Sequence, residues 1–208
     1  MSQLKIWGRM SSINVKKVVW TAQELGLSFE RREAGGVHGV VKTPTYIALN
    51  PNSQIPVMED GDYVLWESNV ITRYLCAKHS IGNFYPENLE ERFNAERWME
   101  WQQTMANPAS RNGFWHLIRL PIDQQDLALV AQSNALVEPL MAILDAHLST
   151  RSFMVGERFT MADIPIGCEV QRWFGLPQKR QVRPHIERWF ASLLARPAAK
   201  GVLDLALA

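Results

Sequence analysis

Hydrophobic positions in the first third of the chain switch between short continuous runs and helical spacing. Apolar residues cluster at 4–7 and again within 27–32, and between these runs they recur every three or four positions from Val15 to Leu25. The short runs predict buried strands, and the recurring pattern predicts an amphipathic helix. A strand, a helix and a strand in this order predict a βαβ unit whose two strands are parallel.

The pattern then predicts a short helix, a hairpin and a second long helix. Helical residues are expected over 44–49, before an Asn-Pro turn, and two strands over 56–59 and 63–65. An Asp-Gly pair between those strands favours a tight hairpin turn. Apolar residues from Ile71 onward recur at helical spacing, so the helix that opens at Ser68 is expected to bury one face.

The remainder of the chain carries helical periodicity and no strand-like segment of useful length. Glycine, asparagine and proline interrupt the pattern over 81–89, which predicts a linker. We therefore expect an α/β domain over residues 1–80, with the order βαβαββα, and an all-α helical-bundle domain over 90–208. Helices are expected at 90–106, 113–119, 124–148, 161–174 and 184–194, with a short piece after Pro197.

Composition and charge argue against several classes of partner. The 208 residues include 22 basic and 21 acidic side chains, a formal net charge of +1, so no bulk attraction to nucleic acid or membranes is expected. Cys76 and Cys168 stand far apart and the histidines lack metal-ligand spacing, which predicts no metal site and no dithiol centre. The first ten residues lack the apolar core of a signal peptide, and no apolar run approaches the length of a bilayer span. A reduced, cytoplasmic location is expected.

The residues that open the helix at Ser68 are candidates for ligand binding. A helix start offers unpaired N–H groups, and together with the Ser68 hydroxyl they could bind a carboxylate. Glu67, directly before it, could bind an ammonium group. A small molecule with both groups is an amino acid, and a γ-glutamyl group fits that description. The alternative is structural: Ser68 caps the helix and Glu67 complements its dipole.

These two residues are part of a longer motif between residues 50 and 75. The order Asn-Pro, Ile-Pro, Asp-Gly, Glu-Ser and Ile-x-x-Tyr-Leu resembles the glutathione-binding half of the glutathione S-transferase family. The resemblance is to cytosolic, bacterial members of serine or asparagine type, similar to the theta, zeta and nu classes. It implies a thioredoxin-like fold for the first domain, a cis bond before Pro56, and glutathione as co-substrate without a metal.

The resemblance assigns a glutathione site residue by residue. The Glu67-Ser68 pair would hold the γ-glutamyl group, and the backbone of the extended residue before the proline would pair with the cysteinyl part as an added strand. Gln54 is placed to reach the ligand backbone or its glycyl end. Lys42 is a further candidate for the glycyl carboxylate, with a solvated surface charge as its alternative. The predicted glutathione-binding residues are Lys42, Gln54, Ile55, Pro56, Glu67 and Ser68.

Glutathione chemistry requires an ionised thiol. A thiol with an ordinary pKa of about 8.5 is largely ionised near neutral pH when a donor hydrogen-bonds the thiolate. That donor is expected between the first strand and the first helix, where Ser11, Ser12 and Asn14 are available. We rank Ser12 first, Asn14 second and Ser11 third, and the alternative role of each is to cap the helix. The junction has no cysteine, and the strand carries Trp7 instead of the tyrosine of other classes.

The second substrate is expected to bind across the cleft, on the first long helices of the second domain. Met105, Arg111, Phe114 and Trp115 supply apolar and cationic surface that suits an aromatic or carboxylated electrophile, with core packing as the alternative. Further along, Thr160 and Asp163 match a capping box that the family buries in its helical domain. The role of that box is folding.

The resemblance therefore implies a transferase that binds glutathione, stabilises its thiolate and adds it to a small hydrophobic electrophile, as in detoxification. Glutathione-dependent isomerisation or peroxide reduction on the same scaffold is one alternative. A non-catalytic interaction module, as in some translation factor subunits, is another. The Glu67-Ser68 pair and the donors near the first helix favour the enzyme. Family analogy also predicts a homodimer.

Overall fold

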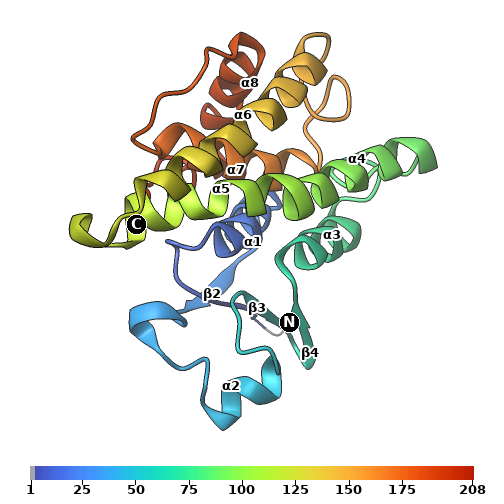
Figure 1. The fold of residues 1–208 in the computed structure, drawn as a ribbon. Helices are drawn as coiled ribbons and strands as arrows, with labels where there is room; N and C mark the ends of the chain where they lie inside the picture. Colours follow the sequence, from blue (N-terminus) through green and yellow to red (C-terminus); the bar gives the residue numbers. More distant parts are fainter. Residues whose placement is uncertain (1–2) are drawn as a thin grey trace.

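The computed structural model describes residues 3–208, and its first part is a four-stranded sheet with helices on both sides (Figure 1). The expected order of strands and helices in this first domain is confirmed, and each observed boundary lies within two residues of the predicted one. A short 3-10 helix, Gly36–His38, lies in the loop after the second strand. The elements are β1 Leu4–Trp7, α1 Ile13–Glu24, β2 Phe29–Arg32, α2 Pro44–Leu49, β3 Val57–Asp60, β4 Tyr63–Trp66 and α3 Ser68–His79.

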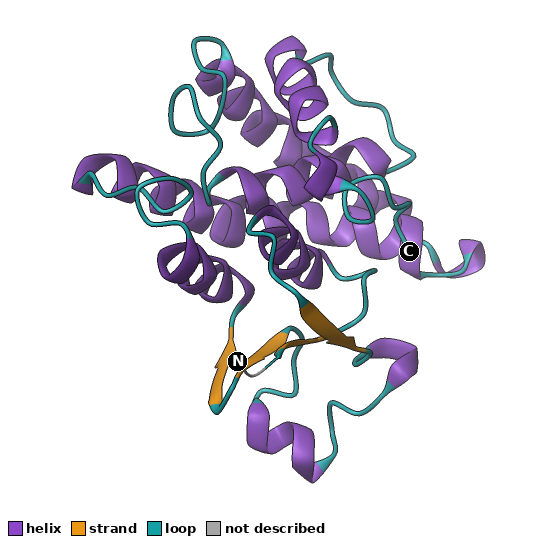
Figure 2. Cartoon of the chain, turned by 180° about the vertical axis from the view of Figure 1, so that it is seen from behind, coloured by secondary structure: helices purple, strands orange, loops and turns teal. Residues whose placement is uncertain are grey.

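The strand order in the sheet is β2-β1-β3-β4. β2 runs parallel to β1, whereas β3 and β4 continue the sheet as an antiparallel hairpin. α1 and α3 pack together between the sheet and the second domain, and α2 lies on the far side of the sheet (Figures 1 and 2). Ile6 and Met58, paired across β1 and β3, are fully buried, so the sheet contributes directly to the main core.

The second domain is helical, as expected, and packs on α1 (Figure 1). α1 contacts α7 in particular, and α6 contacts both α5 and α8. The core is therefore continuous between the two domains. The elements are α4 Leu89–Trp101, a π-helix Gln102–Ala106, α5 Asn107–Phe114, a second π-helix Trp115–Arg119, a 3-10 helix Ile122–Gln124, α6 Leu127–Leu148, α7 Asp163–Gly175, α8 Pro184–Leu194 and a 3-10 helix Pro197–Ala199.

The break predicted between residues 106 and 113 is wrong, because the chain stays helical from α4 through the second π-helix. The Asn107 N–H donates to the carbonyl of Gln102, five residues back, which makes the turn before Pro108 wider than an α-helical turn. A proline lacks the N–H of a regular helix, and its ring crowds the preceding turn. The π turn places Pro108 in the first turn of α5 instead of the middle of a regular helix.

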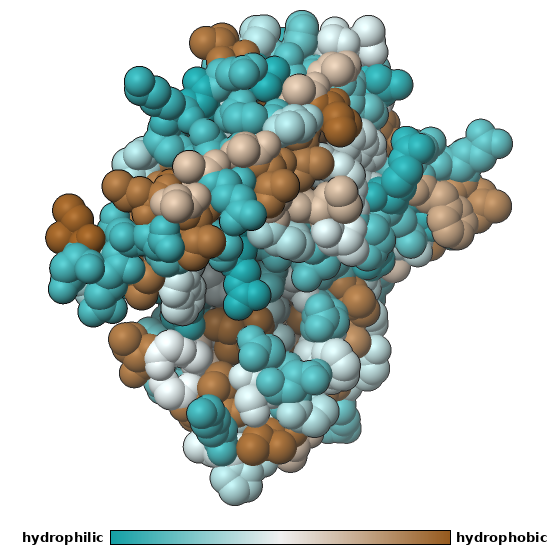
Figure 3. All heavy atoms as spheres, viewed as in Figure 1, coloured by the Kyte–Doolittle hydropathy of each residue, from teal (hydrophilic) through white to brown (hydrophobic). Residues whose placement is uncertain are grey.

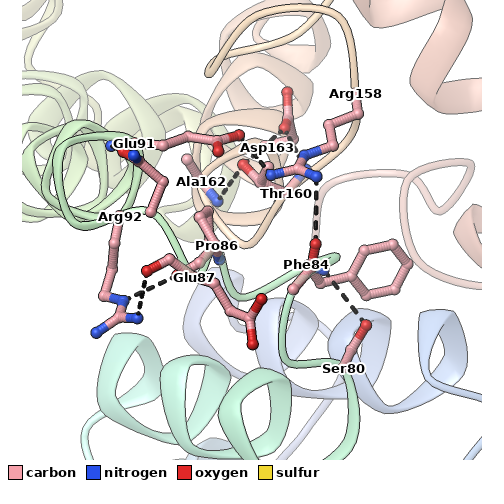
Figure 4. A network of polar contacts seen from close by, with 12 residues as sticks. Ser80, Phe84, Pro86, Glu87, Glu91, Arg92, Arg158, Thr160, Ala162 and Asp163 are labelled. Carbon is pink, nitrogen blue, oxygen red and sulfur yellow. Dashed lines mark hydrogen bonds and ion pairs between the residues drawn. The ribbon is translucent and has the colours of Figure 1, made fainter.

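The linker between the domains is fixed to the helical domain by polar contacts (Figure 4). Arg158 donates to the carbonyl of Gly82 at 3.2 Å and to Oε1 of Glu91 at 2.7 Å. The backbone N–H of Met161 donates to the carbonyl of Phe84 at 2.9 Å. The segment that the sequence predicts as a linker is therefore held by hydrogen bonds from the loop before α7.

Asp163 is fully buried at the start of α7 and accepts hydrogen bonds from three donors, two in the loop before α7 and one in α8. Its carboxylate accepts from the N–H of Thr160 at 2.8 Å, the N–H of Met154 at 2.9 Å and Nε1 of Trp189 at 3.0 Å. Burial raises the pKa of Asp163 to about 6, while the hydrogen bonds act in the opposite direction. The predicted pairing of Thr160 with Asp163 is present, and it connects a loop, α7 and α8.

α6 is, within residues 3–208, the one helix long and apolar enough to cross a membrane by length and composition alone, with a mean hydropathy of 1.6. Its apolar residues are interrupted by polar ones at 132–134 and by Glu138 and Pro139, so they do not form one continuous apolar run. A core helix can meet the same criterion, and α6 buries Val137, Met141 and Leu144 against its neighbours. Its outer face shows a stripe of apolar side chains in Figure 3, and Leu136 and Ile143 are more than half exposed there.

The Asp163 contacts predict a large loss of stability on truncation. We expect Asp163→Ala to lower the free energy of unfolding by about 3–5 kcal/mol, because each of three buried donors loses its partner at about 1–3 kcal/mol. Urea unfolding with a fitted m-value measures the change. The matched control is Asp123→Ala, an exposed position, where a change within about 0.5 kcal/mol is expected. A loss below about 1 kcal/mol for Asp163→Ala would contradict the role given to these hydrogen bonds.

Candidate functional site

A pocket of about 330 Å³ lies between the two domains, and the surface is visibly hollowed there in Figure 3. Three segments form it: the loop between β1 and α1, residue 54 before β3, and the α5 region with its following π-helix. Most of the residues predicted to act on the thiol and the electrophile line this one pocket, together with one residue, Gln54, of the predicted glutathione site. They are Ser11, Ser12, Asn14, Gln54, Arg111, Phe114 and Trp115.

The loop between β1 and α1 presents three polar side chains at the opening of α1. Ser12 occupies the N-cap position with extended backbone angles, φ −93° and ψ 124°, but its side chain makes no capping bond. The hydroxyl of Ser11 accepts a hydrogen bond from Nε of Arg9 at 3.0 Å. Oδ1 of Asn14 is buried and unpartnered within the described chain. Capping, the structural alternative for Ser12, therefore does not occupy its hydroxyl.

The loop before β3 offers an open stretch of backbone. The Ile55–Pro56 peptide bond is cis, as the resemblance implies. The carbonyl of Gln54 accepts from the Tyr46 hydroxyl at 2.9 Å and from Nδ2 of Asn50 at 3.0 Å, which fixes the loop. Within residues 3–208 no other backbone group bonds to the backbone of Ile55. Its N–H and C=O are therefore available for a ligand chain that extends the sheet edge.

The opening of α3 has the geometry of an anion site. Glu67 is its N-cap residue and has φ 73° and ψ 107°, a region that non-glycine residues rarely adopt. Its side chain makes no capping bond, so it does not use the N–H groups of the first turn. Ser68 follows and is 3% exposed. Strained backbone of this kind occurs preferentially at ligand sites.

Not every predicted residue lies in the pocket. Glu67 and Ser68 form the separate feature at the opening of α3 and are not among the pocket-lining residues. Lys42 is exposed in the loop before α2 and does not line the pocket. Met105 is 51% exposed in the first π-helix and is also absent from the lining.

A buried polar network behind the pocket connects the two domains. Nζ of Lys17 on α1 donates to Oε1 of Gln102 at 2.7 Å, and Nε2 of Gln102 donates to Glu169 at 2.8 Å. Glu169 also accepts from the Ser110 hydroxyl at 2.5 Å and lies 3.8 Å from Nη1 of Arg172. Burial lowers the pKa of Lys17 to about 8. All five side chains are buried, so the network fixes α1 against α5 and α7.

Sequence reasoning missed three arginines that line the pocket: Arg9, Arg119 and Arg172. Nη2 of Arg119 donates to the carbonyl of Ser11 at 2.9 Å and so reaches from the helical domain to the loop before α1. Arg119 stands four residues after Trp115, and this spacing places both side chains on one helix face. The spacing could therefore have indicated that Arg119 lines the same pocket as Trp115. No comparable local signal indicates Arg172, which is in the buried helix α7.

The described residues hold no group of three His, Cys, Asp or Glu side chains placed to bind a metal ion. Cys76 and Cys168 are both fully buried. Burial raises the pKa of each thiol to about 12. Neither cysteine lines the interdomain pocket. The chemistry of the pocket therefore depends on hydroxyl, amide and guanidinium groups.

A four-stranded sheet with a cis-proline loop, a second helical domain and a pocket between them define a two-domain class of thiol-dependent transferase. Residues 2–77 match the family model described as glutathione S-transferase, N-terminal domain, and residues 103–197 match the C-terminal domain model. The chain belongs to the glutathione S-transferase family and is a transferase that acts on glutathione.

Relatives that are similar over almost the whole chain include bacterial and plant enzymes. Glutathione S-transferase GstB of Escherichia coli (strain K12) is 36% identical over 203 residues, which cover 96% of this chain and 97% of that protein. Glutathione S-transferase 3 of Zea mays is 30% identical over 204 residues, 95% of this chain and 92% of that protein. The theta-class enzyme of Xanthomonas axonopodis pv. citri with glutathione bound superposes with a TM-score of 0.96 and 39% identity, over 100% of both chains.

The burial of both cysteines predicts that the folded protein is inert to thiol reagents. With a pKa of about 12, only about one thiol in 10,000 is ionised at pH 8, and burial also blocks access. We expect an aromatic disulfide reagent to report no fast-reacting thiol in the native protein and two after unfolding in urea. One or more rapidly reacting thiols in the native protein would contradict the placement of Cys76 and Cys168.

Proposed function

We propose that glutathione binds along the sheet edge of the first domain with its sulfur in the interdomain pocket, beside Ser12. In this arrangement the γ-glutamyl group lies at the opening of α3 and the cysteinyl part lies along the backbone of Ile55. The observation that carries the proposal is that the Ser12 hydroxyl makes no capping hydrogen bond to α1 and lines a pocket that Gln54 also lines. Serine hydroxyls at helix N-caps ordinarily bond to the helix itself.

The opening of α3 suits both charges of the γ-glutamyl group. The Ser68 hydroxyl and the N–H groups of the first turn would bind the carboxylate, because the positive end of the helix favours an anion. The Glu67 carboxylate would bind the ammonium group. The unusual backbone of Glu67 supports this assignment, since it leaves the first turn uncapped.

The remaining parts of glutathione have partners on the same side of the sheet. The N–H and C=O of Ile55 would pair with the cysteinyl main chain, as an added strand does. Gln54 would reach the glycyl end, and we assign Lys42 the weaker role of attracting the glycyl carboxylate from the exposed loop before α2. Pro56 sets the direction of the chain at this point.

Ser12 would activate the thiol by hydrogen bonding. A donor on the thiolate favours the charged form, and a charge-assisted hydrogen bond of about 1.5–3 kcal/mol corresponds to about one to two pKa units. The thiol proton leaves to solvent, the sulfur forms a bond to the electrophilic carbon, and the leaving group departs with its electron pair. Asn14 and Ser11 are the second and third candidates for the donor. The Arg9 contact to Ser11 makes that hydroxyl less available.

Comparison with the Xanthomonas enzyme supports a conformation that is ready for ligand. This chain superposes on the glutathione-bound form of that enzyme with a TM-score of 0.96 and on its apo form with 0.87. The chain as a whole is therefore more similar to the liganded form of that enzyme than to its apo form. A pre-formed site loses less entropy on binding than one that must first be ordered.

The electrophile would bind on the helical side of the pocket. Phe114 and the half-exposed Trp115 supply aromatic surface, and Arg111 supplies a positive charge. Conjugation of a small electrophile, as in detoxification, is the activity that this arrangement supports. Met105 would contribute only to the outer rim, because it lies outside the pocket lining.

We also propose that the protein is a cytoplasmic homodimer. Apolar side chains are exposed along β4, α3 and α4, where Tyr63, Trp66, Val70 and Phe93 are 37% to 60% exposed. Exposed apolar groups of this size commonly mark interfaces between subunits. Sedimentation velocity at micromolar concentration is expected to give a species of twice the chain mass, 23.8 kDa. A single species of the monomer mass would reject the dimer.

The activation of the thiol predicts a specific effect of removing the Ser12 hydroxyl. We expect Ser12→Ala to raise the pKa of the bound glutathione thiol by about one to two units, because the thiolate loses its donor. The short-wavelength ultraviolet absorbance of the thiolate of enzyme-bound glutathione, followed as the pH is varied, measures that pKa. The catalytic efficiency kcat/KM should fall by about 10- to 100-fold at neutral pH.

Three further variants distinguish a loss of thiol activation from a general disturbance of the fold. Ser12→Thr keeps a hydroxyl and should retain the low thiol pKa, whereas Ser11→Ala should move it less than Ser12→Ala does. An unchanged thiol pKa in Ser12→Ala, with a large shift in Asn14→Ala, would transfer the role to the amide. No retention of the protein on immobilised glutathione and no conjugation of a model aromatic chloride would favour a non-catalytic module instead.

A further inference from the structure

The interdomain pocket has an unusually positive lining. Among the described residues that line it are four arginines, Arg9, Arg111, Arg119 and Arg172, and no aspartate or glutamate. Within residues 3–208, Glu169 is the one carboxylate that forms an ion pair with any of them, at 3.8 Å from Arg172. Three guanidinium groups therefore border the pocket without an acidic partner in the described chain.

Two of these guanidinium groups are held in place around one aromatic ring. Arg119 lies 5.2 Å and Arg172 lies 4.8 Å from the centroid of Phe114. Arg119 also donates to the carbonyl of Ser11, while its Nε is buried and has no partner among the described groups. Arg119 and Arg172 are thus held in the pocket wall, whereas Arg111 is an exposed side chain at its rim.

The positive groups are close enough to repel one another. Burial first, and then the charges of Arg9 and Arg172, lower the pKa of Arg119. Like charges in a partly buried site cost free energy unless an anion neutralises them. The thiolate of bound glutathione supplies one negative charge at the sulfur, which leaves part of the positive charge unbalanced. A second anion is therefore favoured in the same pocket.

The uncharged part of the pocket indicates what kind of molecule bears this anionic group. Trp115 is 49% exposed and lies next to Phe114, so flat apolar surface borders the arginines. A planar ring packs well on such surface, and guanidinium groups pair with carboxylates in well-defined bidentate geometry. A molecule with a ring and an acid group matches both features.

We propose that the second substrate is an aromatic electrophile that bears a carboxylate or a similar anionic group, and that Arg111 and Arg119 bind this group. The inference rests on the proposed function, since it concerns the partner of the glutathione thiolate. Arg172 packs against the ring of Phe114 and forms an ion pair with Glu169, so it does not bind the substrate anion itself. The arginines select and orient the substrate, and the covalent step remains attack of sulfur on carbon with departure of the leaving group.

Two substrates that differ in one group test the proposal: 4-chloro-3-nitrobenzoate and 4-chloro-3-nitrobenzamide. Each kcat/KM is divided by the uncatalysed rate constant with glutathione, because the two rings differ in intrinsic reactivity. We expect the corrected value for the benzoate to exceed that for the benzamide by about tenfold, the equivalent of one good charge pair. Raising the ionic strength from about 0.01 M to about 0.5 M should narrow this ratio through screening.

Variants of the cluster identify the groups responsible. Arg111→Gln and Arg119→Gln should each lower the benzoate-to-benzamide ratio by about fivefold to tenfold, and Arg111→Lys should restore part of it. The matched control is Arg97→Gln, an exposed arginine on α4 outside this pocket, which should leave the ratio unchanged. A wild-type ratio of one or below, or equal losses for both substrates in Arg111→Gln, would overturn the proposal.

A binding measurement separates this inference from the proposed function. Calorimetric titration with the two glutathione conjugates, carrying a carboxylate or a carboxamide on the ring, should show about tenfold tighter binding of the carboxylate. Equal binding of both conjugates would overturn the anion site and leave the glutathione site standing. Binding of neither conjugate, together with no turnover of the benzamide, would overturn both.

Discussion

The hydrogen bond from Lys17 to Gln102, buried where the two domains meet, is the contact on which the rest of the site depends. An ammonium group removed from water costs several kcal/mol unless polar partners replace the solvent. Here the side-chain oxygen of Gln102 accepts a hydrogen bond from the ammonium group, and its side-chain nitrogen donates one to Glu169. α1, which opens at Ser12, is thereby held at a fixed position relative to the helices that border the pocket. The position of the loop before α1 therefore depends on a buried charge whose hydrogen bonds are satisfied.

The two π-helices explain how the helical domain reaches this arrangement. Each inserts a wider turn, one on either side of α5, and wide turns of this kind often occur at functional sites. The first contains Gln102, which accepts a hydrogen bond from Lys17. The second contains Arg119, which donates a hydrogen bond to the loop before α1. The irregular turns therefore coincide with the contacts that cross between the domains. They join the loop before α1 to the helical wall of the pocket.

The order of elements could be predicted from the sequence because it depends on local signals. Apolar spacing identified the helices, and the Ile-Pro, Asp-Gly and Glu-Ser pairs identified the loops of the first domain. The continuous helix through Pro108 could not be predicted, since a helical period of 3.6 does not reveal an added residue in one turn. Lys17 reads as an ordinary lysine, and its partner Gln102 is 85 residues away. Arg9 and Arg172 were missed for the same reason, because they reach the pocket from segments that are distant in sequence from the predicted Arg111.

The most direct test of the account is a crystal structure of the protein with glutathione. We expect the sulfur to lie within hydrogen-bond distance of Oγ of Ser12, inside the pocket between the domains, with the γ-glutamyl group at the opening of α3. Glutathione bound elsewhere, or its sulfur directed away from the loop before α1 while that pocket is filled by side chains of the protein, would contradict it.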